Sequence, residues 1–259
     1  MNVAVCVKQI PSAEVPQAFD ASSKTLVRTG PLVLDESDSF SVEMALRLVE
    51  QSGGGEVTLI SVVPEGETQG LRTALAMGAD RAMLVSDPLL AGLDALGTAK
   101  VLAAMIRRLD VSLVLAGTES SDGYTGTVPV QVAELLDYPA VSFVRHVEIS
   151  GDQLVIERQT EDGYDEVTCP LPAVISVTAG VVEVRYPSFK GIMAAKSKPV
   201  EVLTVADLGL EAASLGAVGA RQEVIAFEQA ELRSAGRIIT DTGDAFETVV
   251  ELLASWNVV

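Results

Sequence analysis

The chain has few of the side chains that perform catalysis or bind metals. Its 259 residues include one histidine, two cysteines and one tryptophan, and aromatic residues make up only 4%. Metal centres built from His and Cys, and nucleophilic catalysis by Ser/His or Cys/His pairs, therefore have almost no support. Cys6 and Cys169 both lie in apolar, strand-like runs, which predicts buried, unreactive thiols. We expect no catalytic residue and no metal site.

Basic residues and long apolar runs are also scarce. Lys and Arg number 18 against 36 Asp and Glu, so the net charge is −18, which argues against nucleic acid or an anionic membrane surface as the main partner. No apolar run reaches the roughly 18 residues of a membrane span. The first residues enter a strand-like pattern without a basic segment, so we expect no signal peptide and no membrane insertion. These features favour a cytoplasmic protein.

What the chain does contain is an alternation of strand-like and helix-like segments. Hydrophobic residues make up 48% of the sequence, enough for a large core. We expect strands at 2–8, 56–63, 81–85 and 111–116, with helices at 39–51, 66–77, 92–108 and 128–136. This alternation predicts an α/β fold with a doubly wound, mostly parallel sheet. Further strand-like runs at 140–149, 153–160, 164–169 and 173–178 predict an antiparallel extension of that sheet.

The C-terminal part has a different pattern. Residues 208–220 are rich in glycine and other small residues and are interpreted as a linker. Residues 240–256 then show the periodicity of an amphipathic helix. We therefore expect an α/β domain over 1–205, followed by a linker and helical arm over 206–259 that docks on a partner subunit.

The segment 111–136 has the pattern of an anion-binding site. An apolar strand leads into a glycine-studded loop at 117–127, and Thr127 and Pro129 suit the start of the helix that follows. The first turn of a helix carries unpaired N–H groups and the positive end of the dipole. The alternative is an ordinary strand-to-helix loop with capping residues.

The composition of this loop predicts binding of a nucleotide without hydrolysis. It has neither a Gly-Lys-Ser/Thr ending nor a Gly-x-Gly-x-x-Gly pattern. It contains no Lys or Arg, but it does contain Glu119 and Asp122, which equips it poorly to stabilise a transferring phosphate. Ligands of doubly wound sheets bind outside the carboxyl ends of the strands. That rule adds Cys6, the acidic turn at 35–38 and Val62 to the same site.

A second candidate surface lies at 184–198. This segment has four basic residues and no acid, in a chain that is otherwise strongly acidic. Aromatic, Met and basic residues in a projecting loop are typical of a protein-binding hot spot. The alternative is a loop that covers the core and merely exposes its lysines. The residues concerned are Arg185, Tyr186, Phe189, Lys190, Ile192, Met193, Lys196 and Lys198.

Several segments together resemble the beta, or small, subunit of electron transfer flavoprotein. They are Val-Lys-Gln-Ile-Pro at 7–11, Leu-Arg-Thr-Ala-Leu-Ala-Met-Gly-Ala-Asp at 71–80, the Asp-Gly of 122–123 with the helix after it, Leu-Pro-Ala-Val at 171–174, and 185–196. Their order and spacing match over nearly the whole chain. The resemblance implies a heterodimer with an alpha subunit that holds most of one FAD. It implies electron transfer from acyl-CoA dehydrogenases of fatty acid oxidation to a membrane electron transfer flavoprotein-quinone oxidoreductase.

The resemblance also implies that the small subunit buries an AMP with a structural role. Backbone N–H groups of residues 123–127 would bind the phosphate. The AMP contacts, by position, would be Cys6, Asp35, Glu36, Ser37, Asp38, Val62, Gly117, Asp122, Gly123, Tyr124, Thr125, Gly126, Thr127 and Val128.

The family's partner-recognition loop corresponds to residues 186–192, with Phe189 at the apolar anchor. Together with its neighbours, the partner-binding set would be Tyr186, Phe189, Lys190, Ile192 and Met193. The chain departs from the family in four places: Asp35 and Gly126 stand where many members have Asn, and Ala13 and Ser37 stand where some place aromatic residues near the flavin. Two alternatives remain: a flavin-bifurcating form with a second FAD in the beta site, and a stand-alone adenine-nucleotide sensor.

Overall fold

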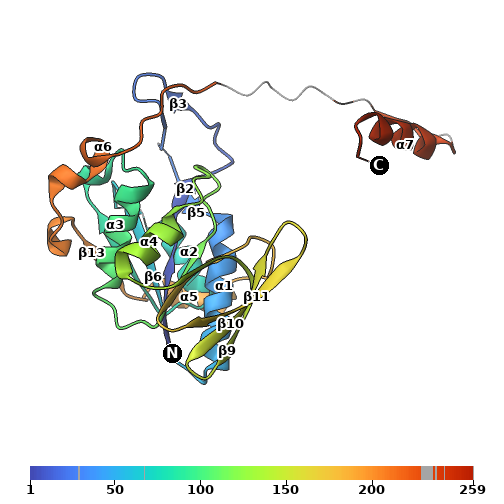
Figure 1. Cartoon of the computed structure of the whole chain (residues 1–259). Coiled ribbons are helices and arrows are strands. Elements are labelled where there is room, and N and C mark those ends of the chain that lie inside the picture. Colours follow the sequence, from blue (N-terminus) through green and yellow to red (C-terminus); the bar gives the residue numbers. More distant parts are fainter. Residues whose placement is uncertain (29, 67, 229–235, 237, 242, 259) are drawn as a thin grey trace. The chain divides into compact units, whose positions relative to one another are not determined.

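The computed structural model describes residues 1–28, 30–66, 68–228, 236, 238–241 and 243–258 (Figure 1). The chain divides into two units, Met1–Val224 and Ile225–Val259. The first unit is built on a nine-stranded sheet of order β11-β10-β9-β12-β8-β1-β6-β7-β13. Its strands are β1 (Asn2–Cys6), β6 (Glu56–Val63), β7 (Arg81–Ser86), β8 (Leu113–Gly117), β9 (Ala140–Ser150), β10 (Gln153–Gln159), β11 (Tyr164–Pro170), β12 (Ala173–Val177) and β13 (Val200–Leu203).

The doubly wound, mostly parallel sheet is confirmed. The strands from β9 to β13 in the spatial order pair in parallel, and β10 pairs antiparallel with both β9 and β11. One placement differs from expectation, because β12 does not extend the antiparallel part. It lies between β8 and β9 and is parallel to both. All five of its residues are buried, as in parallel strands that are covered on both faces.

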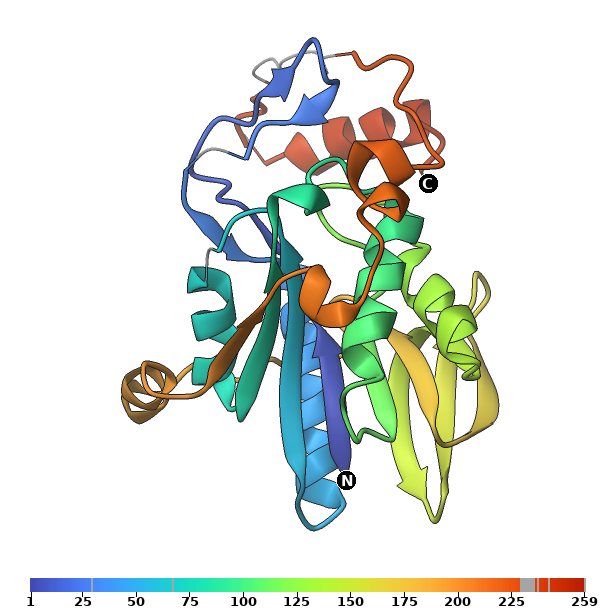
Figure 2. The same ribbon diagram turned by 90° about the vertical axis from the view of Figure 1, so that its left-hand side faces the viewer.

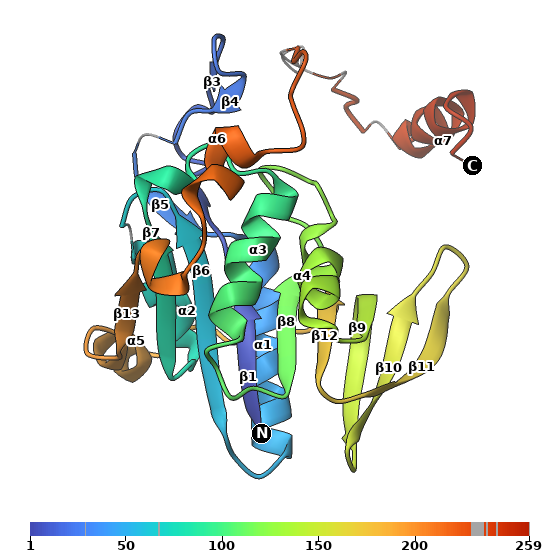
Figure 3. The same ribbon diagram turned by 60° about the vertical axis from the view of Figure 1, so that its left-hand side comes forward.

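Helices cover both faces of the sheet, and the alternation of side chains along β1 sorts them. Val3 and Val5 belong to the core under helices α1 and α2, whereas Ala4 packs with the opposite core under α3 and α4. Figure 3 shows α3 in front of the strands and α1 behind them. Full burial of a Val or Leu side chain stabilises the fold by about 1.5–3 kcal/mol. These helices are α1 (Glu36–Gln51), α2 (Gln69–Met77), α3 (Ala95–Ile106) and α4 (Val128–Leu136).

Short polar side chains set where these helices begin. The Asp35 carboxylate accepts a hydrogen bond from the N–H of Ser37, so α1 starts at Glu36, three residues before the expected position. Asp94 does the same for α3 through the N–H of Gly97. Helix α2 ends before Gly78, whose φ is +146°. A residue with a side chain adopts this φ only with strain.

Two stretches that we expected to be irregular contain short elements instead. Between β1 and α1 lie two small ladders, β2 (Gln9–Pro11) with β5 (Leu32–Leu34) and β3 (Phe19–Asp20) with β4 (Thr25–Leu26). The expected linker at 208–220 instead forms helical turns within the first unit, and Leu215 is buried in the core under α3. These turns are η2 (Ala206–Leu208), η3 (Ala212–Ser214) and α6 (Gly216–Gly219), and a further turn, η1 (Pro88–Leu90), follows β7.

The second unit contains the expected C-terminal helix, α7 (Ala245–Ser255). None of its described residues is buried within its own unit, and Phe246, Val249, Val250 and Trp256 are exposed. Within the described ranges, every helix falls short of the length and apolarity that crossing a membrane requires.

Candidate functional site

The order of the strands places a ligand crevice at one edge of the sheet. From β1 the chain proceeds through β6 to β7 on one side, and then crosses to β8 on the other side of β1. Ligands of such sheets bind at this switch point, outside the carboxyl ends of the strands. The residues there are Cys6, at the end of β1, and Gly117, at the end of β8. Figure 3 shows these two strands side by side. Val62 lies near the same end of β6.

Two buried carboxyl groups from the start of α1 join the parts of this edge. Asp35 accepts hydrogen bonds from the N–H of Ser37 at 3.1 Å and from the N–H of Ser121 at 2.8 Å. Asp38 accepts from the N–H of Lys8 at 2.6 Å. A Cβ atom on Gly117 would lie 2.8 Å from Oδ1 of Asp38, so any side chain there would have to displace this carboxyl group. The acidic turn therefore holds β1, β8 and the loop together, and its buried carboxylates are already engaged.

Burial controls the charge of the groups beneath the loop. It raises the pKa of Asp38 to about 8, with a further contribution from the charge of Asp35, against the hydrogen bonds from the N–H groups of Lys8 and Gly117. Burial likewise raises the pKa of the Cys6 thiol to about 12 and, away from this site on β11, raises that of Cys169. At neutral pH, Asp38 is thus mostly uncharged and both free cysteines are thiols, which makes them poor nucleophiles.

Two basic residues from outside the loop reach Asp122. Lys8 Nζ lies 2.6 Å from Oδ1 of Asp122 and 3.1 Å from Oγ of Ser120, and Arg28 pairs with the other carboxylate oxygen. The Asp122 side chain is only 6% exposed. Although burial acts in the opposite direction, Lys8 and then Arg28 hold the pKa of this carboxyl below its ordinary value. The expectation of a site without cations, which rested on the loop alone, is corrected here.

The exposed part of the loop leaves backbone donors open. The N–H groups of Gly123 and Tyr124 both donate to the carbonyl of Ser120, at 3.3 and 2.9 Å. In the described part of the chain, the N–H groups of residues 125–127 find no acceptor. Thr127 does precede α4, as expected, but its hydroxyl makes no capping bond. Open backbone donors next to an uncapped first turn of a helix are groups of the kind that can bind an anion.

The other predicted contacts lie around this surface. Glu36 is exposed and Ser37 partly buried in the first turn of α1. Tyr124, with a φ of +48°, exposes its ring, and Gly126 has a φ of +64°. Val128 is the first residue of α4. Lys8 and Arg28 were not predicted as site residues from the sequence. Lys8 follows the carboxyl end of β1, so the rule that ligands bind outside strand ends could have identified it. Arg28 comes from an irregular segment without a recognisable pattern.

The second candidate surface is a helix, not the loop that we expected. Helix α5 (Phe189–Ala195) lies on α2 near strand β13 (Figure 2). Its N-cap is Ser188, whose hydroxyl accepts from the N–H of Gly191 at 3.0 Å. Tyr186 is 96% exposed and Phe189 82% exposed. Ala195 is the buried residue of the helix, so most of its apolar side chains face solvent.

Known proteins are similar in sequence to this chain over its full length. The electron transfer flavoprotein domain family matches residues 23–208. An electron transfer flavoprotein subunit beta from Thermoanaerobacterium thermosaccharolyticum is 39% identical over 262 residues, 100% of both chains. One from Mycobacterium tuberculosis is 37% identical, covering 100% of this chain and 99% of the relative. The caffeyl-CoA reductase-Etf complex subunit CarD of Acetobacterium woodii is 33% identical over 93% of each chain. The chain therefore belongs to the electron transfer flavoprotein family, among its beta subunits.

Proposed function

We propose that this electron-carrier subunit pairs with an alpha subunit, binds one AMP structurally and helps to hold a FAD that lies mainly on the alpha subunit. In this role it accepts electrons from acyl-CoA dehydrogenases and passes them through electron transfer flavoprotein-quinone oxidoreductase to the quinone pool. Bound flavin would supply the redox chemistry. The residues of this chain would bind and orient nucleotides and partners.

The observation that carries the AMP assignment is the set of open backbone donors at 125–127, next to the first turn of α4. Several acidic side chains lie at this edge, and two of them repel an anion less than a free carboxylate would. Asp122 is paired with Lys8 and Arg28, and burial keeps Asp38 mostly uncharged at neutral pH. A phosphate can therefore bind to main-chain N–H groups with little repulsion from these two acids. Glu119 also lies next to the donors, because its Oε2 is 3.6 Å from the position that a Cβ atom on Gly126 would take.

The same arrangement favours a structural nucleotide over a hydrolysed one. Both cations at the loop are already bound to Asp122, so neither is free to stabilise a transferring phosphoryl group. The single histidine, His146, lies on β9 and contacts Glu148 on the same strand. The site thus has main-chain groups to hold a nucleotide, and the histidine, the commonest general base, lies on a strand outside it.

Partner recognition is assigned to the exposed face of α5. Tyr186, Phe189, Ile192 and Met193 form an apolar group in solvent, and Lys190 is exposed next to them. An apolar centre with basic residues at its rim suits a partner with an apolar socket bordered by carboxylates. We assign this surface to the dehydrogenases.

A second candidate is a flavin-bifurcating form, in which the beta site holds a second FAD. The chain is similar to CarD, a subunit of a caffeyl-CoA reductase-Etf complex, over 93% of both chains, and this similarity supports the second candidate. Full-length similarity to beta subunits gives no comparable support to a stand-alone nucleotide sensor.

The test is the identity and number of nucleotides released from the purified heterodimer. We expect one FAD and one AMP for each heterodimer. Two FAD and no AMP would favour the bifurcating form, and a heterodimer without any nucleotide besides one FAD would overturn the AMP assignment.

A further inference from the structure

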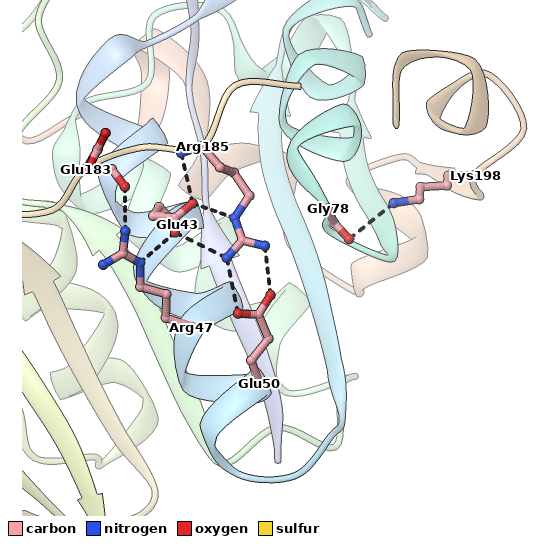
Figure 4. Close-up of polar contacts among 7 residues, drawn as sticks. All are labelled: Glu43, Arg47, Glu50, Gly78, Glu183, Arg185 and Lys198. Carbon is pink, nitrogen blue, oxygen red and sulfur yellow. Dashed lines mark hydrogen bonds and ion pairs between the residues drawn. The ribbon is translucent and has the colours of Figure 1, made fainter. Parts of the chain in front are cut away.

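We propose that Arg185 and Lys198 are positioning residues that lock the docking helix α5 in its binding orientation before a partner arrives. The inference rests on the proposed docking role of α5. The two residues lie just before and just after the helix, and Figure 4 shows the contacts of Arg185 with Glu43 and Glu50 and the contact of Lys198 with Gly78.

The first lock joins the start of the α5 segment to α1. The Arg185 guanidinium donates to Glu43, with Nε 2.7 Å from Oε2 and Nη2 3.2 Å from Oε1. It also donates to Glu50, with Nη1 2.8 Å from Oε1 and Nη2 3.3 Å from Oε2. The backbone N–H of Arg185 adds a bond of 3.2 Å to Glu43. A planar guanidinium matches two carboxylates in a way that a point charge does not.

Glu43 makes this lock hard to open. Its side chain is 2% exposed and also accepts from Nε of Arg47 at 2.6 Å. Although burial acts in the opposite direction, Arg185 and Arg47 hold the pKa of Glu43 below its ordinary value. Arg47 in turn donates to the carbonyl of Glu183 at 2.7 Å, on the same segment. Releasing Arg185 would weaken the pairing of a buried carboxylate, which strongly disfavours the open state.

The second lock is a reciprocal cap between α5 and α2. Lys198 Nζ donates to the last carbonyls of α2 and the turn after it: Leu75 at 3.0 Å, Gly78 at 3.2 Å and Ala79 at 2.6 Å. Arg72 of α2 donates back to the carbonyls of Ala195 at 2.6 Å and Lys198 at 2.8 Å. Each helix end thus receives a cation from the other element, where the helix dipole is negative.

The helix itself has little else to fix it. It has seven residues, far fewer than an isolated helix needs for stability in water, and most of its apolar side chains face outward. Gly191 lies so close to the α2 backbone that a Cβ atom would be 2.4 Å from the carbonyl oxygen of Ala76. The two locks hold that close contact together and so pre-organise the apolar anchors, which lowers the entropy lost on binding.

The locks also divide the basic residues of this segment into two groups. Arg185 and Lys198 are engaged inside the molecule. Lys190 and Lys196 are exposed, and the described residues provide no ion pair for either. Of the four basic residues in the segment 184–198, Lys190 and Lys196 are therefore the two available to carboxylates of a partner.

The experiment uses the complete heterodimer with Arg185→Gln. Electron transfer from an acyl-CoA dehydrogenase is measured as a function of carrier concentration. We expect KM for the carrier to rise about tenfold, a change of about 1.4 kcal/mol, with kcat within twofold of the wild-type value. AMP and FAD content should not change. The KM of Arg185→Lys should lie between those of wild type and Arg185→Gln, because one ammonium cannot engage both carboxylates in the same geometry.

Arg145→Gln is the control. Arg145 of β9 pairs with Glu157 of β10 at 3.3 Å, and neither residue belongs to the two locks. A KM in Arg185→Gln no higher than in Arg145→Gln would overturn the inference. Should Arg185→Gln not fold, Glu50→Gln removes only the outer half of the lock, since Glu50 is 61% exposed. An unchanged KM there, with Arg185→Lys also normal, would overturn it equally.

Phe189→Ala separates this inference from the proposed function. If Phe189→Ala raises KM and Arg185→Gln does not, α5 docks the partner without needing the lock. If neither variant changes KM, the docking role of α5 itself has failed.

Discussion

The nucleotide edge and the docking helix use charged residues in the same way but offer opposite surfaces to their ligands. At the edge, Asp35 and Asp38 bond to backbone N–H groups inside the fold, and main-chain donors at 125–127 stay open. At α5, Arg185 and Lys198 bond inward, and apolar side chains stay exposed. In both regions ionisable side chains that bond inward build the site, while main-chain donors at the edge, and apolar side chains with Lys190 and Lys196 at α5, are left to contact the ligand.

The largest effect is expected from Asp38→Asn, which tests whether a buried acid at the edge is structural. The folded state raises the pKa of Asp38 from 3.8 to about 8. The unfolded state therefore loses its proton first as pH rises, and this group's contribution to stability, present below pH 4, is lost between about pH 4 and pH 8. Because Asn has no proton to lose, the stability of the variant relative to wild type should rise by up to roughly several kcal/mol between pH 4 and pH 8. A cost independent of pH is added, because the Asn NH2 group cannot accept from one of the two backbone N–H groups that bond to Asp38.

The measurement is urea unfolding of both heterodimers at pH 5 and pH 8. The advantage of the variant should grow with pH. An advantage that shrinks with rising pH would mean that Asp38 is stabilised as a carboxylate.

Gly117→Val tests the close packing at the same edge. Its Cβ atom would lie 2.8 Å from Oδ1 of Asp38, a buried side chain whose other oxygen, Oδ2, accepts from the N–H of Lys8. Overpacking of this kind destabilises by about 1–3 kcal/mol and should displace the loop, with loss of AMP. Wild-type stability together with full AMP occupancy would contradict the geometry of the edge.

Phe189→Ala tests the contact side of the comparison at α5. The ring is 82% exposed, so its removal should leave stability and nucleotide content unchanged. Loss of an aromatic anchor at an interface typically costs about 2 kcal/mol, roughly thirtyfold in KM for the carrier. Loss of stability with unchanged transfer kinetics would place Phe189 among the structural residues instead.

Gly126→Val tests the contact side at the nucleotide edge, with Gly151→Val as its matched control. The two glycines have φ values of +64° and +66°, and Gly151 lies in the turn between β9 and β10. Both substitutions should introduce backbone strain of about 1–2 kcal/mol. Only Gly126→Val should speed the release of AMP, and equal release rates would remove the loop from the nucleotide site.

The parts of the fold that follow from local pattern were predictable from the sequence. Strand β6 and helix α4 have the expected bounds, because their periodicity and terminal residues are unambiguous. Helix α1 begins earlier than expected, since Asp35 is a cap and not part of a free acidic turn. Helix α5 is only seven residues long, too short for a helical period to stand out.

Non-local contacts account for the rest. The position of β12 between β8 and β9 depends on which strand it pairs with across the sheet, and the sequence offers no local mark of that choice. The same is true of Arg28, which reaches Asp122 across 94 residues of chain. The inward use of Arg185 and Lys198 was likewise invisible, because composition alone makes every cation of the segment look available to a partner.

The central claim is that main-chain N–H groups bind the phosphate of AMP. The most direct test is an amide NMR titration, in which AMP is added to an AMP-depleted heterodimer whose beta subunit is ¹⁵N-labelled. If main-chain donors bind the phosphate, the amide protons of residues 125–127 should shift strongly downfield, and those of Gly123 and Tyr124, which already donate to Ser120, should shift less. Saturable AMP binding that leaves the amides of residues 125–127 unmoved would contradict the account.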